Sequence, residues 1–439
     1  MLKIRQFILV LGDLALAFFA LFLTLLVRYF GNFSQDILNA HLIPFTIIYL
    51  VWLLCFYIFG LYDLTGMRQA TELLRKTLKT FAVCFALALA FFYLIPFFGI
   101  TPKRNLLIDI LIFGTLIFFW RRLFCFLFSS LYLQKVAFIG KTETALTLEK
   151  DLNENPQFGY KSVGFLKGDA TANILKEKLL KEKIKTIILS KDTGNNSTLT
   201  DKLYQLLSLK ITFWEIDKAY EKILQKVPID ALKQEWFLKN LAALNKEGYD
   251  KVKRVFDFIM ALILLLLTSP FWLLTALAIK LEDGGKVFYK QKRIGKDNKV
   301  FTIFKFRSML ETAEQNGAQW AKDKDERRTK IGKVIRRLHI DEFPQMLNVL
   351  RGDLSTTGPR PERPEFVSEL EKTIPHYKLR HLIKPGFTGW AQTRWIKYAR
   401  SKEDSFEKFQ YDLYYLKNRS FTLDLSILLR TFQLFLKKG

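Results

Sequence analysis

One apolar run in the second half of the chain decides how the fold is interpreted. From Val255 to Ile279 it reads VFDFIMALILLLLTSPFWLLTALAI, which exceeds the ~20 residues that an α-helix needs to cross a bilayer. Ser269 and Pro270 lie inside the run. Proline removes a backbone donor and clashes with the preceding turn, and a neighbouring hydroxyl can satisfy the carbonyl that is released. The sequence therefore predicts a membrane helix with a break in its middle.

Basic residues flank this run on both sides. A helix that crossed the membrane would place one basic cluster on the outer side, against the positive-inside rule. We therefore predict a re-entrant helix over residues 255–279 whose two ends lie on the cytoplasmic side, and the alternative is an ordinary kinked span. The flanking cations are Lys251, Lys253 and Arg254 before the run, and Lys280, Lys286, Lys290, Lys292 and Arg293 after it.

Four further apolar runs precede the run at 255–279 in the sequence, at residues 7–27, 42–59, 80–98 and 106–128. They predict a four-helix transmembrane domain over residues 1–130. The first run is long and has no small-residue cleavage site, so we expect an uncleaved anchor. Basic residues at their ends place the N-terminus and everything after residue 130 in the cytoplasm. These residues are Lys3, Arg5, Arg68, Arg75, Lys76, Lys79, Arg121 and Arg122.

Two acids, Asp13 and Asp109, lie inside these predicted spans. An acid within a membrane helix is a functional candidate. Both residues lie near a helix end, so we expect snorkelling or a hydrogen bond between helices instead.

The composition supports a membrane protein with basic faces. Half of the 439 residues are hydrophobic, yet 67 basic and 42 acidic residues give a formal charge of +25. Such faces suit anionic headgroups or phosphorylated substrates. Nucleic-acid binding is the alternative, but neither zinc-finger spacing nor an RNA-binding aromatic signature is present, so we expect no nucleic-acid partner. Cys55, Cys84 and Cys125 lie in apolar runs and are expected to be buried.

The segment 131–248 predicts a separate α/β module. Strands expected at 135–140, 185–190 and 211–215 alternate with helices at 142–153 and 201–210, the pattern of a parallel sheet. After the first strand Gly140 stands alone, where a dinucleotide-binding fingerprint has three glycines. We therefore predict a Rossmann-like module without nucleotide binding, with a regulatory or dimer-forming role, and a cofactor site is the alternative.

The remaining chain, residues 249–439, is polar and mainly helical by its periodicity. Apolar residues recur at helical spacing over 330–338, 344–350 and 426–436. We expect these helices to lie on the membrane surface with Lys and Arg toward headgroups.

Adjacent carboxylates, Asp341 and Glu342, form the densest polar constellation of this domain. Asp341 is expected to cap a helix whose first turn holds Pro344, and a helix N-terminus attracts phosphate. Arg336 and Arg337 precede the pair and are suited to clamp phosphate oxygens. A carboxylate among such groups can attack phosphorus, and the second can bind Mg²⁺. The alternative is a capped helix with a surface glutamate.

Several rigid basic segments accompany these acids. Residues 351–364 read RGDLSTTGPRPERP, in which neighbouring prolines restrict Arg360 and Arg363. Upstream, Lys305 and Arg307 flank an aromatic residue, and residues 384–392 form another tight turn. Several such loops in one short domain favour a binding site over a merely solvated surface.

On these residues the segment 253–439 resembles the bacterial sugar transferase family of monotopic phosphoglycosyl transferases. The whole chain is similar to its longer members, the polyprenyl glycosylphosphotransferases of exopolysaccharide and O-antigen assembly, of the undecaprenyl-phosphate glucose phosphotransferase type. The matching stretches are, in order, KVPID at 226–230, KRVFD at 253–257, SP at 269–270, VFYKQKRIG at 287–295, KFRSM at 305–309, IDEFPQ at 340–345, GPRPE at 358–362, KPGFTGW at 384–390 and YDLYY at 411–415.

The resemblance implies a role for each matching residue. Asp341 would be the nucleophile, and Glu342 would help to bind Mg²⁺. Ser269 and Pro270 would make the re-entrant helix. The nucleotide-sugar site would include Pro359, Arg360 and Pro361, with Lys305 and Arg307 beside it.

The implied reaction transfers a hexose-1-phosphate from a UDP-sugar to undecaprenyl phosphate. It would be the first membrane step of exopolysaccharide, O-antigen or capsule assembly, at the cytoplasmic face of the bacterial inner membrane. Homodimerisation through the module or the spans is a further hypothesis. One alternative is a degenerate, non-catalytic regulator or scaffold, against which Asp341, Glu342, Arg360 and Lys305 are intact. Another is a dehydratase-type enzyme using the module, against which the fingerprint glycines are missing.

Two stretches depart from the family's pattern. Residues 355–357 read STT, where a hydrophobe usually precedes Gly358, and residues 393–398 read TRWIKY in place of a common Asn-Gly turn. Both lie in or near the expected sugar pocket. The choice among glucose, galactose and an N-acetylated sugar therefore stays open.

Overall fold

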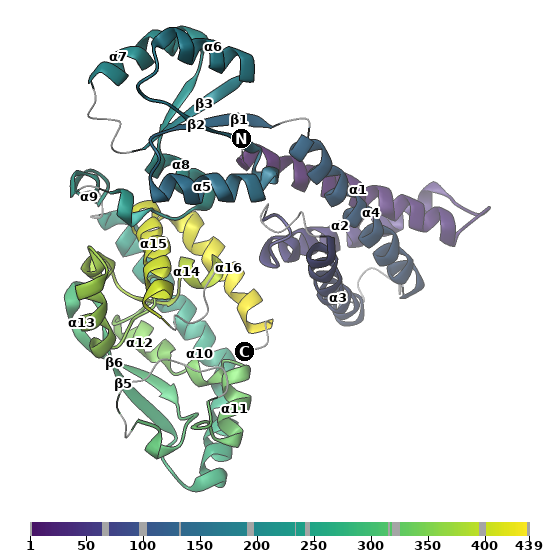
Figure 1. The fold of residues 1–439 in the computed structure, drawn as a ribbon. Helices are drawn as coiled ribbons and strands as arrows, with labels where there is room; N and C mark the ends of the chain where they lie inside the picture. Colours follow the sequence, from purple (N-terminus) through teal and green to yellow (C-terminus); the bar gives the residue numbers. More distant parts are fainter. Residues whose placement is uncertain are drawn as a thin grey trace. The chain divides into compact units, whose positions relative to one another are not determined.

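The chain folds into two compact units, residues 1–219 and 220–439, in a computed structural model (Figure 1). The structure describes residues 2–63, 70–95, 103–130, 133–190, 197–232, 234–241, 246–314, 317, 325–394 and 401–436. Helices dominate both units, and small sheets complete them. Arg68, the end of the third predicted span at 96–98 and residues 395–398 of the predicted departure lie outside the described residues.

The first unit begins with four long apolar helices. They are α1 (Leu2–Arg28), α2 (Gln35–Ile58), α3 (Ala70–Leu94) and α4 (Lys103–Ser130). These helices confirm the four predicted apolar segments, and each is long and apolar enough to cross a membrane. A fifth helix of this kind, α10, belongs to the second unit.

Polar side chains join the four helices from within. Arg121 of α4 donates two hydrogen bonds to Asp13 of α1, at 2.7 and 2.6 Å, and both side chains are fully buried. Asp109 of α4 accepts hydrogen bonds from the hydroxyls of Tyr49 at 2.9 Å and Thr24 at 3.4 Å. Bonds between helices are therefore confirmed for both acids, whereas snorkelling is not, because neither acid reaches the bundle surface.

The three cysteines are buried, as predicted, and none of them forms a disulfide. Cys84 also serves the bundle through its backbone, since its carbonyl accepts a hydrogen bond from the Trp52 indole at 3.0 Å.

A four-stranded parallel sheet completes the first unit. Its strands are β1 (Gln134–Ile139), β2 (Tyr160–Leu166), β3 (Ile184–Leu189) and β4 (Thr212–Glu215), in the order β2-β1-β3-β4. Helices α5 (Glu143–Glu154), α6 (Ala172–Glu182), α7 (Ser197–Gln205) and α8 (Ile216–Leu224) connect or follow them. Three strands and two helices match the prediction. β2 and α6 were not predicted, because Gly164 interrupts β2 and charged residues fill α6.

The second unit contains α10 (Glu247–Asp283), which is continuous through Pro270. The predicted interruption is therefore absent from this helix. Pro270 lacks the N–H that would bond the Leu266 carbonyl, and the Ser269 hydroxyl donates to that same carbonyl at 2.8 Å. The acceptor released by the proline is thus satisfied from within the helix, which explains why helical structure persists.

An antiparallel hairpin follows α10, formed by β5 (Phe288–Ile294) and β6 (Val300–Phe306). Its tight turn places Asp297 and Asn298 at φ of 54° and 60°, a left-handed conformation that Asp and Asn tolerate. The hairpin was not predicted, because lysines and an arginine interrupt the apolar alternation of its strands.

Short helices and a two-stranded parallel sheet make up the rest of the second unit. The predicted helices at 330–338 and 344–350 correspond to α11 and α12, and the one at 426–436 begins earlier. These elements are α11 (Lys330–Arg337), α12 (Gln345–Arg351), β7 (Ser355–Thr357), α13 (Pro364–Thr373), β8 (Gly386–Thr388), α14 (Trp390–Arg394), α15 (Lys402–Asn418) and α16 (Phe421–Leu436).

The main apolar core of the second unit includes a segment that sequence analysis grouped with the α/β module. Val227 and, from α9 (Gln234–Leu241), Trp236 and Phe237 pack in one cluster with Leu413 and Tyr415 of α15. The segment 227–241 therefore packs as part of the second unit.

Candidate active site

The acidic pair lies in a tight turn between α11 and α12. His339 adopts a left-handed conformation, with φ of 56°, and residues 340–342 form one turn of 3₁₀-helix. The N-terminal cap position of α12 is Pro344, and no side chain caps the helix. The predicted capping role of Asp341 is therefore wrong, because the 3₁₀ turn ends before the α-helix begins. The seven residues of α12 are also too few for a strong helix dipole.

Glu342 is held by two cations from different elements. Its Oε1 lies 3.2 Å from Lys305 Nζ on β6, and Arg360 reaches both carboxylate oxygens, with NH1 3.3 Å from Oε2. The Glu342 side chain is almost buried. Burial alone would raise its pKa, but the charges of Arg360 and Lys305 outweigh burial and hold the pKa well below its usual range. Glu342 is therefore an anion at neutral pH.

Asp341 shares the burial of Glu342 but not its neutralising contacts. Burial first, and then the adjacent charge of Glu342, raise the pKa of Asp341 to about 6. Lys305, Arg336 and Arg360 oppose this rise through their positive charge. The two neighbouring carboxylates therefore differ in their pKa. Glu342 is an anion held in ion pairs, whereas the pKa of Asp341 lies near 6.

Asn348 fixes this turn against the hairpin. Its side chain accepts from the Phe304 N–H at 3.1 Å and donates to the Thr302 carbonyl at 2.7 Å. Both partners lie on β6, the strand that carries Lys305. The two hydrogen bonds from the buried Asn348 side chain to the β6 backbone thereby fix the distance between Lys305 and the acidic pair.

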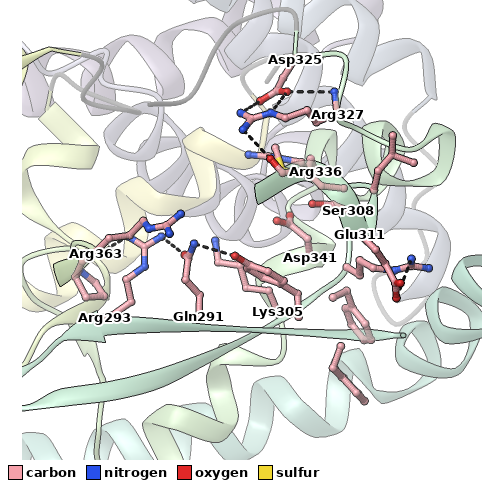
Figure 2. A pocket seen from close by; sticks show the side chains of 18 of the residues that line it. Gln291, Arg293, Lys305, Ser308, Glu311, Asp325, Arg327, Arg336, Asp341 and Arg363 are labelled. Atoms are coloured by element: carbon pink, nitrogen blue, oxygen red, sulfur yellow. Dashed lines mark hydrogen bonds and ion pairs between the residues drawn. The ribbon is translucent and has the colours of Figure 1, made fainter. Parts of the chain in front are cut away.

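Asp341 opens into a pocket of about 540 Å³ with a strongly basic lining. Figure 2 shows Asp341 and Lys305 near its middle, with Gln291, Arg293 and Arg363 on one side. The other side carries Arg336, Ser308, Glu311, Asp325 and Arg327. An excess of fixed cations around a buried carboxylate suits a diphosphate ligand.

A further acid, the largely buried Glu362, lies in the wall of the same pocket. It pairs with Lys408 of α15, with Arg293 at 3.8 Å and with Arg380 at 3.9 Å. Arg380 also binds Asp412 at 2.9 Å. Burial would raise the pKa of Glu362, but Lys408, Arg380 and Arg293 outweigh it and lower the pKa to about 2. This acid is a permanent anion that neutralises part of the basic wall.

The structure brings most of the predicted site residues together. Arg307 is buried, lines the pocket and pairs with Asp283 and with Glu311. Pro359 directly precedes the pocket residues Arg360 and Pro361 in the sequence but does not itself line the pocket. The predicted residues that line the pocket are Lys305, Arg307, Arg336, Asp341, Arg360, Pro361 and Arg363.

Besides Pro359, four predicted residues lie outside the pocket lining, and one of them is Glu342, whose carboxylate is held by Lys305 and Arg360. Arg337 is exposed on α11, although its neighbour Arg336 faces the pocket. Ser269 and Pro270 lie exposed within α10 and contribute no atoms to the pocket wall.

Sequence reasoning missed the contribution of β5. Tyr289, Gln291 and Arg293 occupy every second position of this strand and all line the pocket. These residues belong to the stretch VFYKQKRIG, but Gln291 and Arg293 are polar, so the stretch shows no apolar alternation that would identify the strand. Lys408 was also missed, and no local pattern identifies it, because its partner Glu362 lies far away in sequence.

Comparison with known proteins places this chain in a family. Residues 248–438 match the family described as bacterial sugar transferase. A UDP-N-acetylgalactosamine-undecaprenyl-phosphate N-acetylgalactosaminephosphotransferase of Aeromonas hydrophila is 45% identical over 221 residues, which are 50% of this chain and 51% of the relative. A UDP-glucose:undecaprenyl-phosphate glucose-1-phosphate transferase of Klebsiella pneumoniae is 31% identical over 331 residues, 70% of this chain and 69% of the relative.

A similarly named transferase of Xanthomonas campestris is 30% identical over 328 residues, 68% of this chain and 66% of the relative. The chain thus spans about half to two-thirds of these relatives. A membrane protein with a basic, acid-centred pocket is the class that the fold and the site define. The chain belongs to the bacterial sugar transferase family.

Proposed function

We propose that this protein transfers a sugar-1-phosphate from a UDP-sugar to undecaprenyl phosphate, with Asp341 as the nucleophile. One observation carries the proposal: Asp341 is a buried carboxylate with a raised pKa at the centre of a basic pocket, while its neighbour Glu342 is held by Lys305 and Arg360. The relatives from Aeromonas and Klebsiella are named for the same kind of transfer.

The proposed reaction has two displacements at phosphorus. An Asp341 oxygen attacks the phosphorus that bears the sugar, the bond from that phosphorus to the bridging oxygen breaks, and UMP leaves with the bonding electrons. An oxygen of undecaprenyl phosphate then attacks the phospho-sugar-aspartate, and the Asp341 carboxylate is released. Lys305, Arg336 and Arg360 are placed to hold the phosphate oxygens during both steps.

Mg²⁺ as a cofactor is part of the proposal. Mg²⁺ is usually held by one or two carboxylates together with substrate phosphates, and Asp341 and Glu342 supply adjacent carboxylates. Substrate phosphate oxygens would complete the coordination of the ion. Glu342 would hold the ion, and its Oε2, with one Arg360 contact at 3.3 Å, is the oxygen better suited to do so. When bound, Mg²⁺ would neutralise charge on the diphosphate.

The membrane arrangement is part of the proposal. We place α10 as a re-entrant helix that bends at Pro270 and returns to the cytoplasmic face of the inner membrane. The basic residues on both sides of its apolar run support this topology. Cysteines introduced at Lys251 and at Lys286 should both react with a membrane-impermeant thiol reagent only from the cytoplasmic side. Labelling of one of them from the periplasm would contradict re-entry.

We further propose that the parallel sheet of the first unit is a Rossmann-like, CoA-binding-like module without nucleotide binding, with a role in regulation or homodimerisation. Its parallel sheet with helices between the strands supports a doubly wound α/β module, and the order β2-β1-β3-β4 is the flavodoxin-like variant of that class. A chain beginning at Tyr220 keeps Val227, Trp236 and Phe237 in the core of the second unit. That chain should retain UMP release, whereas a chain beginning at Lys246 should lose stability.

The direct test is a panel of UDP-sugars with undecaprenyl phosphate and Mg²⁺, using the full chain in detergent or nanodiscs. UMP release that depends on one UDP-sugar is the expected result and would identify the sugar. If a properly folded chain releases no UMP from any glucose, galactose or N-acetylated sugar donor, the proposed activity is wrong and a non-catalytic role takes its place.

A further inference from the structure

The first turns of α10 contact both segments that build the candidate active site. Lys253, Arg254 and Asp257 belong to this part of the helix, and Lys253 and Asp257 are buried. None of these three residues lines the pocket. Buried charges are costly unless they are paired, so their partners show what the helix holds in place.

Arg254 holds the segment that carries the acidic pair. Its guanidinium donates to the carbonyl of Val349 at 2.6 Å and to that of Leu350 at 2.7 Å. These carbonyls belong to the last turn of α12, the end of a helix that favours a cation, and the Val349 carbonyl also accepts from the Gly352 N–H at 3.1 Å. Since α12 directly follows the turn of Asp341 and Glu342, Arg254 fixes that turn relative to α10.

Asp257 and Lys253 hold the segment that leads to Arg360. Asp257 Oδ1 accepts from the Thr356 N–H at 3.0 Å and from the Thr356 hydroxyl at 2.5 Å. Lys253 Nζ donates to the Thr357 hydroxyl oxygen and lies 3.1 Å from Asp424 Oδ2. Both threonines belong to β7, three and four residues before Arg360.

Thr357 is the centre of this network. Its hydroxyl donates to Asp424 Oδ1 at 2.7 Å while it accepts from Lys253, and the Tyr415 hydroxyl donates to the same Asp424 oxygen at 2.7 Å. All of these side chains are buried. This hydroxyl stands where the resemblance leads one to expect a hydrophobe, so the network is a property of this chain.

The backbone between Thr357 and Arg360 leaves little room for independent movement. A Cβ on Gly358 would lie 2.7 Å from the Lys384 carbonyl oxygen and 2.9 Å from the Gly386 nitrogen. Pro359 follows with a restricted φ. A displacement of Thr357 is therefore passed along the chain to Arg360, which reaches Glu342 by way of its guanidinium.

We propose that Lys253, Asp257 and Thr357 are positioning residues, which act through β7 to hold Arg360 against Glu342. Arg254 holds the opposite side of the same contact. The membrane helix thereby sets the spacing between the arginine and the acidic pair. This inference rests on the proposed function, because its effect is measured as UMP release.

The chain offers a matched pair for the test. Thr357 and Thr388 face each other across β7 and β8, and both are buried. The Thr388 hydroxyl bonds that of Thr431 at 2.8 Å and takes no part in the α10 network. Thr357→Val should lower kcat/KM for UMP release roughly tenfold or more, because small displacements of positioning groups are costly. Thr357→Ser, which keeps the hydroxyl, should recover most of this loss, and Thr388→Val should remain near wild type.

A double-mutant cycle distinguishes positioning from general destabilisation. If Thr357 acts through Arg360, Thr357→Val should have little further effect on kcat/KM in an Arg360→Gln background. An equal fold-loss in both backgrounds, an equal loss in Thr388→Val, or no loss in Thr357→Val would overturn the inference. All comparisons use full-length protein in nanodiscs, normalised to the folded fraction measured by size exclusion.

Thr356→Val provides the same cycle should Thr357→Val fold poorly, because it removes only the hydroxyl bond to Asp257. Failure of the proposed function has a different signature. In that case the wild type releases no UMP, or Asp341→Asn releases it normally. The positioning inference alone would be overturned by a different set of results. The wild type would be active, Asp341→Asn would be inactive, and the effects of the two substitutions in the double-mutant cycle on kcat/KM would simply add.

Discussion

Two buried clusters in this protein both combine carboxylates with basic side chains, but the ratio of acids to bases differs between them. In the helical bundle, Asp13 and Arg121 form a one-to-one pair through two parallel hydrogen bonds, with both side chains fully buried. In the pocket, two adjacent acids share three nearby cations, and the ion pairs go to Glu342. The bundle pair balances its charges without a ligand, whereas in the pocket Lys305 and Arg360 pair with Glu342 and the charge of Arg336 acts on Asp341 outside those ion pairs.

This difference separates a structural ion pair from a reactive site. A complete pair stabilises one packing arrangement and has no capacity for further chemistry. A carboxylate whose pKa is raised by burial and by a like charge is energetically unfavourable as an anion. Binding or bonding to phosphorus relieves that cost. The proportions of acids and bases, more than their burial, therefore indicate where chemistry takes place.

The largest expected effect is on the reaction itself. Asp341→Asn should reduce UMP release by at least about 10³-fold, because the amide is a poor nucleophile. Radiolabelled UDP-sugar would measure both UMP release and label retained on the protein. Asp297→Asn, in the exposed hairpin turn, is the matched control and should release UMP normally. Comparable rates for the two variants would refute the nucleophile assignment.

The next effect breaks the complete pair. Asp13→Asn leaves the Arg121 cation buried without its partner and should destabilise the bundle by about 3–5 kcal/mol. Denaturant unfolding in micelles would measure the change. A double variant with Asp13→Asn and Arg121→Met should regain much of the lost stability. UMP release per folded molecule should stay unchanged in both, and a large specific loss would show that the pair is not merely structural.

A third prediction concerns pH. The pKa of Asp341 is raised from 3.8 to about 6, so its contribution favours folding below pH 4 and is lost as pH rises through 6. Asp341→Asn should therefore be more stable than wild type at pH 7.5, by at most roughly 3 kcal/mol, and equally stable near pH 4. UMP release by the wild type should rise with pH through about 6, because the ionised carboxylate is the nucleophile. A flat stability difference across this range would contradict the raised pKa.

The smallest effect refines the comparison. Arg121→Lys keeps the charge of the bundle pair but loses its two-pronged geometry, and should cost about 1–2 kcal/mol of stability. Arg360→Lys makes the same change in the pocket. There it should mainly lower kcat/KM and leave the unfolding transition nearly unchanged. Equal stability losses at both positions would remove the distinction between the two clusters.

The sequence predicted the elements whose signal is local. The four apolar helices follow from their uninterrupted hydropathy, and three strands of the parallel sheet follow from short apolar runs. Asp341, Glu342, Lys305 and Arg360 could be named because the ordered motifs of the family contain them. Their actual contacts depend on folding, since Lys305, Glu342 and Arg360 come from three separate segments.

Other features could not be inferred because they depend on backbone conformation or on distant partners. The capping prediction for Asp341 failed because His339 is left-handed and starts a 3₁₀ turn, which no residue pattern indicated. The β5–β6 hairpin was missed because pocket-facing Gln291 and Arg293 replace the apolar residues of a usual inner face. The partners of Glu362 come from β5, α15 and residue 380, and only the folded chain brings them together.

Ser269 affects how easily α10 can bend within a lipid bilayer. Most bends in a membrane helix expose an acceptor that needs a water molecule or a neighbouring helix, so the bend depends on its surroundings. In α10 the acceptor at Leu266 is served by a side chain one residue before the proline. The Ser269 hydroxyl thus supplies the hydrogen bond that a water molecule would otherwise donate to this carbonyl. A bend at this position would be tolerated in pure hydrocarbon, with no companion segment to support it.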